Sequence, residues 1–224
     1  LRGLVDADGQ GADAIELTVN YCEVADEIGI RHETMPFSEL SNPRFVENSS
    51  ARCFFCQSMR FDQLAELASQ FDCDTLASGS NASDSGDHRP GLEAMARRDV
   101  YQPLMERRLD KDDVRRVARW LGLSVWDKPS QACLSSRIPH GTNVTAERLE
   151  RIERAEDALH DRGFRQFRVR DHEGLARIEV SREELDDLLS ESMLLEVKSA
   201  VSDAGFDEVT VDLTGYRSGS LNPS

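Results

Sequence analysis

The sequence has few aromatic residues and no long apolar run. Aromatic side chains make up 6% of its 224 residues. No apolar stretch reaches the roughly 18 residues that a membrane-spanning helix needs, and the first residues show no signal-peptide pattern. We therefore expect a cytoplasmic protein with no membrane partner.

Basic residues are scarce as well. The chain has 27 Lys and Arg against 42 Asp and Glu, which gives a formal net charge of −15 and a pI near 4.8. Proteins that bind nucleic acids neutralise phosphates with Lys and Arg. This charge balance therefore argues against a nucleic acid partner.

The five cysteines are an odd number and form no secreted disulfide framework, which favours a reducing compartment. Cys53 and Cys56 form a CxxC pair, and Cys133 lies in the distant segment ACLSSR. No second CxxC follows at zinc-finger spacing. Cys22 belongs to an apolar helical face and Cys73 opens an apolar strand, so we interpret both as buried small hydrophobic residues.

Three thiolates can be interpreted in several ways. They are one ligand short of a closed structural zinc site, whereas they leave one corner of a [4Fe-4S] cluster open to an external ligand. Partly occupied zinc, a redox dithiol and plain buried thiols are the alternatives. The dithiol is disfavoured because no strand–CxxC–helix pattern of thioredoxin type is visible.

The first part of the chain predicts a parallel α/β sheet, because helical and strand patterns alternate. The predicted elements are a helix over 14–29, a strand over 30–35, a helix over 57–71 and a strand over 73–78. Asp110 predicts the N-cap of a further helix over 111–121, which Gly122 ends. Residues 1–13 show no periodicity.

After Pro139 the pattern becomes that of a small α+β domain. Thr145 predicts the start of a helix that runs to about 161. Ser181 and Glu184 form a capping-box pattern that opens a second helix. The predicted strands run through 167–169, 176–180 and 209–213. We place the boundary near residues 139–145, which gives domains 1–140 and 141–224.

Two polar loops are candidate ligand sites. The loop Gly79–Asp84 (GSNASD) follows a predicted parallel strand, where α/β folds bind their ligands, although a plain turn would also explain it. The loop over 215–222 places Arg217 among glycines and serines. By itself, this second loop could equally be an unstructured tail.

Together these motifs resemble the LarE family, the ATP-dependent sulfur transferases of the PP-loop superfamily that act in making the nickel-pincer nucleotide cofactor. The similar segments follow one another in order between residues 16 and 222. They are RCFFC at 52–56, GSNASDSGDHRPG at 79–91, WDKP at 126–129, ACLSSRIPHGT at 132–142, RVR at 168–170, ARIEV at 176–180 and GYRSGS at 215–220.

The resemblance implies a reaction. The expected substrate is pyridinium-3,5-biscarboxylate mononucleotide, whose carboxylate is adenylated by ATP before sulfur displaces AMP. In part of the family, the cysteine matching Cys133 gives up its own sulfur. In the other part, three cysteines hold a [4Fe-4S] cluster that carries an extra sulfide. This chain has all three cysteines, so we place it in the cluster-binding group, with a sulfide donor and a homo-oligomer as expected partners.

The resemblance also implies roles for individual residues. Cys133 is the expected catalytic residue, and it joins Cys53 and Cys56 as a cluster ligand. The polar residues expected beside ATP and Mg²⁺ are Asn81 and Asp84. The expected ligands of substrate phosphate or carboxylates are Arg137, Arg168 and Arg170, and those of a divalent ion are Glu156 and Glu179. A solvated strand face and surface ion pairs are the respective alternatives for these two groups.

Some features depart from the family. The superfamily's pyrophosphate-binding loop SGGxDS is absent, and the nearest segment, DGQGAD at 8–13, does not match. We therefore expect an N-terminally truncated PP-loop domain. The family's GTN-x-DD reads GSNASD here, with Ser83 in place of an acidic residue, and His88 replaces a tyrosine. Competing functions are a tRNA-thiolation enzyme of the same superfamily and a non-enzymatic cluster-binding remnant.

Overall fold

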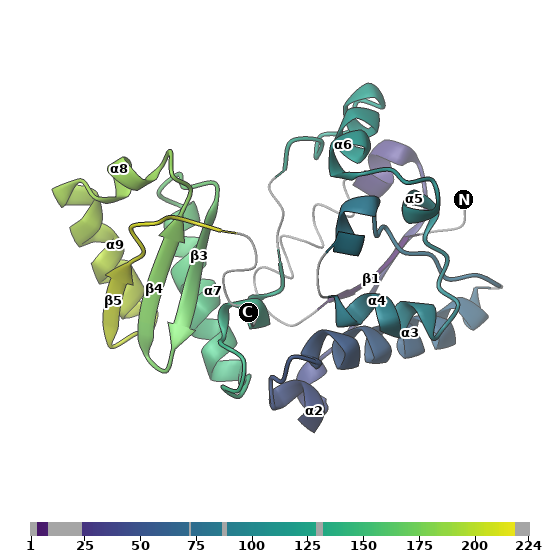
Figure 1. The fold of residues 1–224 in the computed structure, drawn as a ribbon, viewed down its shortest axis with the longest axis horizontal. Coiled ribbons are helices and arrows are strands. Elements are labelled where there is room, and N and C mark those ends of the chain that lie inside the picture. Colours follow the sequence, from purple (N-terminus) through teal and green to yellow (C-terminus); the bar gives the residue numbers. More distant parts are fainter. Residues whose placement is uncertain (1–3, 9–23, 72, 87–88, 129–131, 218–224) are drawn as a thin grey trace. The chain divides into compact units, whose positions relative to one another are not determined.

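The computed structural model describes residues 4–8, 24–71, 73–86, 89–128 and 132–217 (Figure 1). The fold is mixed α/β, as the sequence predicts. The chain divides into two compact units. The N-terminal unit consists of Leu1–Phe45 and Ala51–Lys128, and the C-terminal unit consists of Val46–Ser50 and Pro129–Ser224.

This division differs from the predicted boundary near 139–145. The C-terminal unit includes the Cys133 segment, and it also takes in Val46–Ser50 from early in the sequence. Backbone hydrogen bonds explain this inclusion. The amide of Gly141 donates to the carbonyl of Asn48 at 3.0 Å, and the amide of Val144 donates to the carbonyl of Val46 at 2.9 Å. Sequence periodicity does not reveal a pairing between segments so far apart.

The N-terminal unit contains a parallel strand pair. Strand β1, Leu4–Asp8, pairs with β2, His32–Pro36, in a register that sets Leu4 opposite His32. The predicted strand at 30–35 is therefore confirmed with a small shift. Strand β1 was not predicted, because a five-residue strand in a segment without periodicity leaves little signal.

The predicted strand over 73–78 is wrong. Only an isolated parallel bridge forms there, between Ala77 and Tyr101. The amide of Ser78 donates to the carbonyl of Tyr101, and the amide of Tyr101 donates to the carbonyl of Leu76, both at 2.8 Å. Two hydrogen bonds are too few to extend this apolar segment into a strand.

Helices form most of the rest of the N-terminal unit. They are η1 (Glu39–Ser41), α2 (Pro43–Val46), α3 (Arg52–Gln70), η2 (Ala82–Gly86), α4 (Pro90–Ala96), α5 (Pro103–Glu106) and α6 (Lys111–Trp120). Helix α3 packs on α4, and its Phe61 forms a buried cluster with Met95 and Val100. The predicted N-cap of α6 is confirmed. The amide of Asp113 donates to Asp110 Oδ1 at 2.8 Å, and the amide of Asp110 donates to Asp113 Oδ2 at 3.2 Å, which completes a capping box.

The C-terminal unit is a three-stranded sheet with helices packed against it (Figure 1). Its elements are η3 (Leu134–Arg137), α7 (Ala146–His160), β3 (Phe167–His172), β4 (Leu175–Val180), α8 (Leu185–Leu188), α9 (Glu191–Asp203) and β5 (Glu208–Val211). Strand β4 lies in the middle, antiparallel to β3 and parallel to β5. The single helix predicted after Ser181 is thus two helices, interrupted at Leu189 and Ser190. The capping box predicted at Ser181 and Glu184 is wrong, because the N-cap of α8 is Glu184 and the Ser181 hydroxyl donates to the Glu184 side chain at 2.6 Å.

Strand alternation gives this sheet one apolar face and one polar face. Ala176, Ile178 and Val180 of β4 are fully buried and alternate with Arg177 and Glu179. The apolar core also includes Ile152 and Leu159 of α7, Val169 of β3, and Val197 and Val201 of α9. The opposite, polar face carries the charged side chains from which the candidate site is built.

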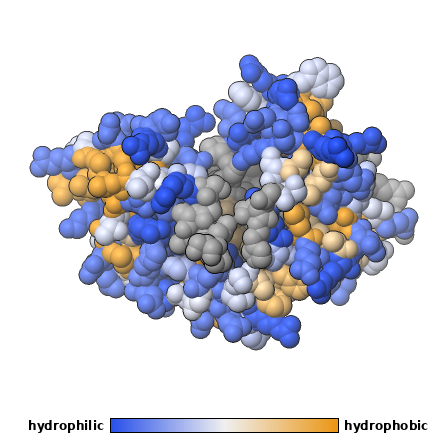
Figure 2. Space-filling view, viewed as in Figure 1, coloured by the Kyte–Doolittle hydropathy of each residue, from blue (hydrophilic) through white to orange (hydrophobic). Residues whose placement is uncertain are grey.

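The surface is largely polar, in keeping with the net charge. Figure 2 shows apolar side chains gathered over α8 and α9, where Leu189, Leu194 and Leu195 are exposed. Within the described part of the chain, no helix is long and apolar enough to cross a membrane.

Buried Asp171 provides a test of this packing. It is fully buried and accepts hydrogen bonds from Arg151 at 2.6–3.0 Å, with Arg148 also in contact, so it ties β3 to α7. Asp171→Ala leaves the arginines without their partner, and we expect it to lower the free energy of unfolding by about 3–5 kcal/mol. Chemical denaturation measures the change. Glu183→Ala, at an exposed position, is the control. An equal loss of stability in both variants would contradict this role of Asp171.

Candidate functional site

Cys53 and Cys56 lie on the first two turns of α3. Their spacing of three residues places both thiols on one side of the helix. Cys53 is exposed and Cys56 is half-buried. The sequence predicts this helix only from residue 57, because residues 54–56 are half-buried and Phe54 and Phe55 pack beside arginines rather than in the apolar core.

The two phenylalanines between these cysteines stack with arginines. The Arg97 guanidinium lies 5.0 Å from the centre of the Phe54 ring, and that of Arg44 lies 5.5 Å from the Phe55 ring. Such cation–π contacts are attractive at this range. They surround the start of α3 with positive charge.

Cys56 has an acidic neighbour that the sequence analysis missed. Its thiol lies 3.3 Å from Glu39 Oε1, and the same oxygen accepts a hydrogen bond from Arg60 at 2.9 Å. Arg60 follows Cys56 by one helical turn, so the sequence could have predicted that it lies close to the thiol. Glu39 could not be found this way, because it comes from the separate helix η1.

The polar loop after residue 78 is an ordered turn. The amide of Asn81 donates to Asp84 Oδ2 at 2.9 Å, and the amide of Ser83 donates to Asn81 Oδ1 at 3.0 Å. Asp84 also forms an ion pair with Arg89 at 2.8 Å. Asn81 and Asp84 therefore lie together, and their role beside ATP and Mg²⁺ stays a prediction.

In the C-terminal unit, Arg137 holds the Cys133 segment. Cys133 is exposed and immediately precedes η3. The Arg137 guanidinium donates to the Cys133 carbonyl at 3.0 Å and to the Ala132 carbonyl, while its other nitrogens bond both oxygens of Glu156 at 2.9 and 2.6 Å. This arginine is only 2% exposed. It therefore links the cysteine segment to α7 through a buried, bidentate ion pair.

Arg170 makes a second link of the same kind. It donates to the Ser136 carbonyl at 3.0 Å and bonds Glu179 Oε2 at 2.8 and 3.1 Å. Arg177 bonds the other oxygen of Glu179 at 3.0 Å. The Cys133 segment is thus attached both to α7 and to the polar face of the sheet.

Glu156 and Glu179 are nearly fully buried and paired with arginines. These are ion pairs, the alternative considered for both residues, but they are buried rather than on the surface. Within either unit, the described residues contain no group of three or more His, Cys, Asp or Glu side chains that could hold a metal. Cys53 and Cys56 belong to one unit and Cys133 to the other. The three-thiol site and the divalent ion site both stay predictions.

Arg168 lies on the same polar face and is 6% exposed. Its guanidinium stacks 5.0 Å from the centre of the Tyr216 ring, and it donates to the Phe167 carbonyl. Burial lowers the pKa of Arg168, and the nearby positive charges of Arg137 and Arg170 lower it further, although Glu156 and Tyr216 act in the opposite direction. The charge of an anion bound here would act in the same direction as Glu156 and Tyr216 and raise the pKa of Arg168.

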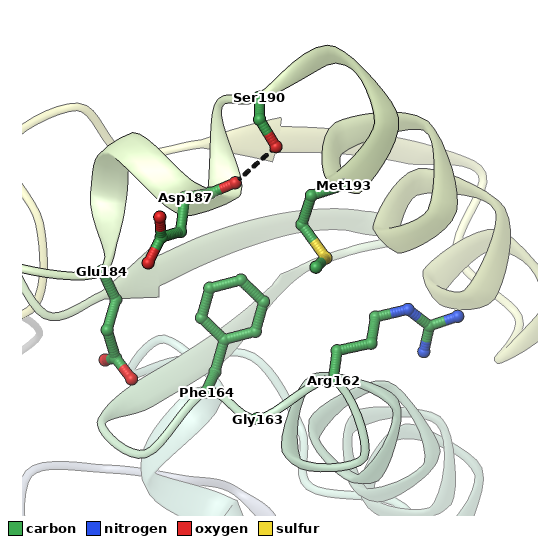
Figure 3. Close-up of a pocket in the computed structure, with 7 residues that line it drawn as sticks. All are labelled: Arg162, Gly163, Phe164, Glu184, Asp187, Ser190 and Met193. Carbon is green, nitrogen blue, oxygen red and sulfur yellow. Dashed lines mark hydrogen bonds between the residues drawn. The ribbon is translucent and has the colours of Figure 1, made fainter.

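A separate pocket of about 300 Å³ opens elsewhere in the C-terminal unit (Figure 3). Its lining consists of Arg162, Gly163, Phe164, Glu184, Asp187, Ser190 and Met193. Its polar groups bond within the chain. Ser190 donates to the Asp187 carbonyl at 2.8 Å, and Glu184 accepts from the amide of Arg165 at 2.6 Å. None of the predicted site residues lines it.

The described structure is therefore that of an α/β protein in which buried arginines lie next to a segment that carries an exposed thiol. No family model matches the sequence. An uncharacterized protein of Synechocystis is 42% identical over 195 residues, which is 87% of this chain and 73% of the relative. An uncharacterized protein of Methanocaldococcus jannaschii is 29% identical over 236 aligned positions, 97% of this chain and 92% of the relative.

The pyridinium-3,5-bisthiocarboxylic acid mononucleotide synthase of Lactiplantibacillus plantarum is 32% identical over 199 residues, 89% of this chain and 71% of the synthase. The chain belongs to the family of this synthase, which is the LarE family that its motifs resemble.

His172 gives the polar face a dependence on pH. Burial lowers its pKa below the ordinary 6.5, and neighbouring Arg177 lowers it further. The folded protein thus binds this proton less tightly than the unfolded chain, so stability falls as the pH drops below about 6.5. We expect His172→Gln to lose less free energy of unfolding than the wild type between about pH 7 and pH 5. Denaturation at each pH measures this, with exposed His160→Gln as control. An unchanged pH dependence in His172→Gln would exclude His172 as its source.

Proposed function

We propose that this protein is a sulfur transferase that converts the adenylated carboxylates of pyridinium-3,5-biscarboxylate mononucleotide to thiocarboxylates. The observation that carries the proposal is the exposed thiol of Cys133 on a segment fixed by Arg137 and Arg170. The same polar face carries Arg168, whose environment favours an anion. The relationship to a synthase of the matching product supports the choice of substrate.

The substrate is anionic, and in this proposal the three arginines have different roles. Glu156 already binds Arg137 through both of its oxygens, and Glu179 binds Arg170 through Oε2. We therefore assign these two arginines chiefly to holding the cysteine segment and completing the positive field. Arg168 is a substrate-binding cation in this proposal because it is buried on the same face, with its guanidinium held against the Tyr216 ring.

The proposed chemistry has two steps. A substrate carboxylate oxygen attacks the α-phosphorus of ATP, which forms the acyl adenylate and releases pyrophosphate. A sulfur nucleophile then attacks the acyl carbon and AMP leaves, which forms the thiocarboxylate. Asn81 and Asp84 would orient ATP with its Mg²⁺, since their turn presents an amide and a carboxylate together.

We further propose that the protein holds an iron–sulfur cluster. Cys53 and Cys56 lie on one side of α3, which suits two ligands of one cluster. In this proposal Cys133 would be the third ligand, and a [4Fe-4S] cluster, when bound, would supply the sulfur that a sulfide donor provides. A homo-oligomer and a cytoplasmic location are further parts of the proposal, taken from the resemblance.

The cluster assignment predicts a selective loss of iron. Replacing Cys53, Cys56 or Cys133 singly by Ala should lower the iron content of anaerobically reconstituted protein, because each change removes one of three ligands. Cys22→Ala and Cys73→Ala should leave iron content unchanged. Iron analysis with absorption spectroscopy measures both. Equal iron loss in all five variants would contradict the assignment.

The substrate assignment predicts a specific role for Arg168. Arg168→Ala should weaken binding of the mononucleotide by about 1.5–3 kcal/mol, the contribution of a charge-assisted hydrogen bond. Arg168→Lys should recover only part, because lysine lacks the planar fork of donors. Calorimetric titration measures the affinities, and exposed Arg165→Ala is the control. Equal affinities in wild type and Arg168→Ala would remove Arg168 from the binding site.

A further inference from the structure

Asn48 is a buried polar residue that the sequence motifs do not single out. Its exposed fraction is 0%. Its backbone has a φ of 55°, which is the left-handed region that few non-glycine residues adopt. It lies in the segment Val46–Ser50 of the C-terminal unit, five residues before Cys53 in the sequence.

The Asn48 side chain holds a turn formed by residues 138–142, which lie at least 90 positions later in the sequence. Its amide nitrogen donates to the carbonyls of Pro139 and Thr142, both at 2.8 Å, and lies 3.3 Å from the carbonyl of Ile138. Its own backbone carbonyl accepts from the amide of Gly141 at 3.0 Å. One residue thus satisfies several backbone groups of residues 138–142, of which the Ile138 carbonyl is buried.

This turn continues directly from the cysteine segment. Within η3, the amide of Ser136 donates to the Cys133 carbonyl at 2.9 Å, and the amide of Ile138 donates to the Ser135 carbonyl at 3.2 Å. Ile138 is 1% exposed, so its position is set by packing. Hydrogen bonds therefore connect the Asn48 amide to Ile138 and Ile138 to Ser135, and the adjacent Ser136 bonds the carbonyl of Cys133.

We propose that Asn48 is a positioning residue for Cys133. Arg137 and Arg170 hold the cysteine segment from α7 and the sheet, and Asn48 holds the turn into which that segment leads. The site requires an amide donor on a left-handed backbone, and Asn is one of the few residues that combines the two. Gly would keep the backbone and lose the donors. The inference rests on the proposed function only for the chemical role of Cys133.

The test is hydrogen exchange of the metal-free protein, followed by mass spectrometry. In Asn48→Gly, the amides of Ser136, Ile138 and Gly141 should exchange roughly tenfold faster, as expected for the loss of more than one buried hydrogen bond. Amides of strand β3 should change only as far as global stability does. Glu173→Gly is the matched control, because Glu173 is exposed and has a φ of 57° in the same unit. Wild-type protection of all three amides in Asn48→Gly would overturn the proposal.

A measurement on the wild type covers the case in which Asn48→Gly does not fold. Positioning by Asn48 requires that the amides of Gly141 and Val144 exchange only with global unfolding, at the same free energy as the core of β3. Exchange of these amides through local opening, with Asn48 intact, would also overturn the proposal.

Iron uptake tests the role of Asn48 separately from the presence of the cluster. After anaerobic reconstitution, we expect Asn48→Gly to hold less iron per chain than wild type and Glu173→Gly. Full iron uptake by folded Asn48→Gly would count against a positioning role. A wild-type protein that binds no iron would contradict the cluster in the proposed function, and the exchange data would then decide the role of Asn48.

Discussion

The buried ion pair between Arg137 and Glu156 is the interaction on which the C-terminal unit depends. Two charges removed from water are stable only when each is fully compensated. Here Glu156 accepts two bonds from Arg137 and a third, at 2.8 Å, from the amide of Val169 at the edge of β3. Helix, sheet and cysteine segment therefore meet at one carboxylate. A substitution at Glu156 would therefore change both the packing of the unit and the position of the cysteine segment.

An acidic protein can still attract an anion at one site, because distant charges are screened and nearby charges are not. The net charge of −15 is spread over the chain, and physiological salt screens charges beyond about 8 Å. A ligand at the polar face therefore responds mainly to the arginines close to it. Burial strengthens this local field, since the same desolvation that lowers the Arg168 pKa also reduces screening.

Local signals in the sequence predicted local structure well. The N-caps Asp110 and Thr145 both accept the expected backbone hydrogen bonds, because a cap depends only on residues within one turn. The resemblance to the family likewise singled out Arg137 and Glu156. Their pairing with each other could not be predicted, because it depends on how α7 packs against η3.

Long-range contacts explain what the sequence did not reveal. Asn48 makes its side-chain hydrogen bonds with residues at least 90 positions away, and no periodicity reports such a contact. Glu39 reaches Cys56 from a separate helix. The apolar segment at 73–78 was read as a strand from its composition, but the structure offers it only a single bridge. In each case the local structure depends on a contact with a residue elsewhere in the sequence, and not on the residue type alone.

The two-segment construction of the C-terminal unit has a consequence for biosynthesis. Val46–Ser50 leaves the ribosome some 90 residues before its hydrogen-bonding partners. At 5–20 residues per second, it waits about 5–18 s for them. During that interval α3 can form with its CxxC pair, while the buried amide of Asn48 faces water. Completion of the C-terminal unit is therefore a late event, and a chaperone that shields Val46–Ser50 would act in this window.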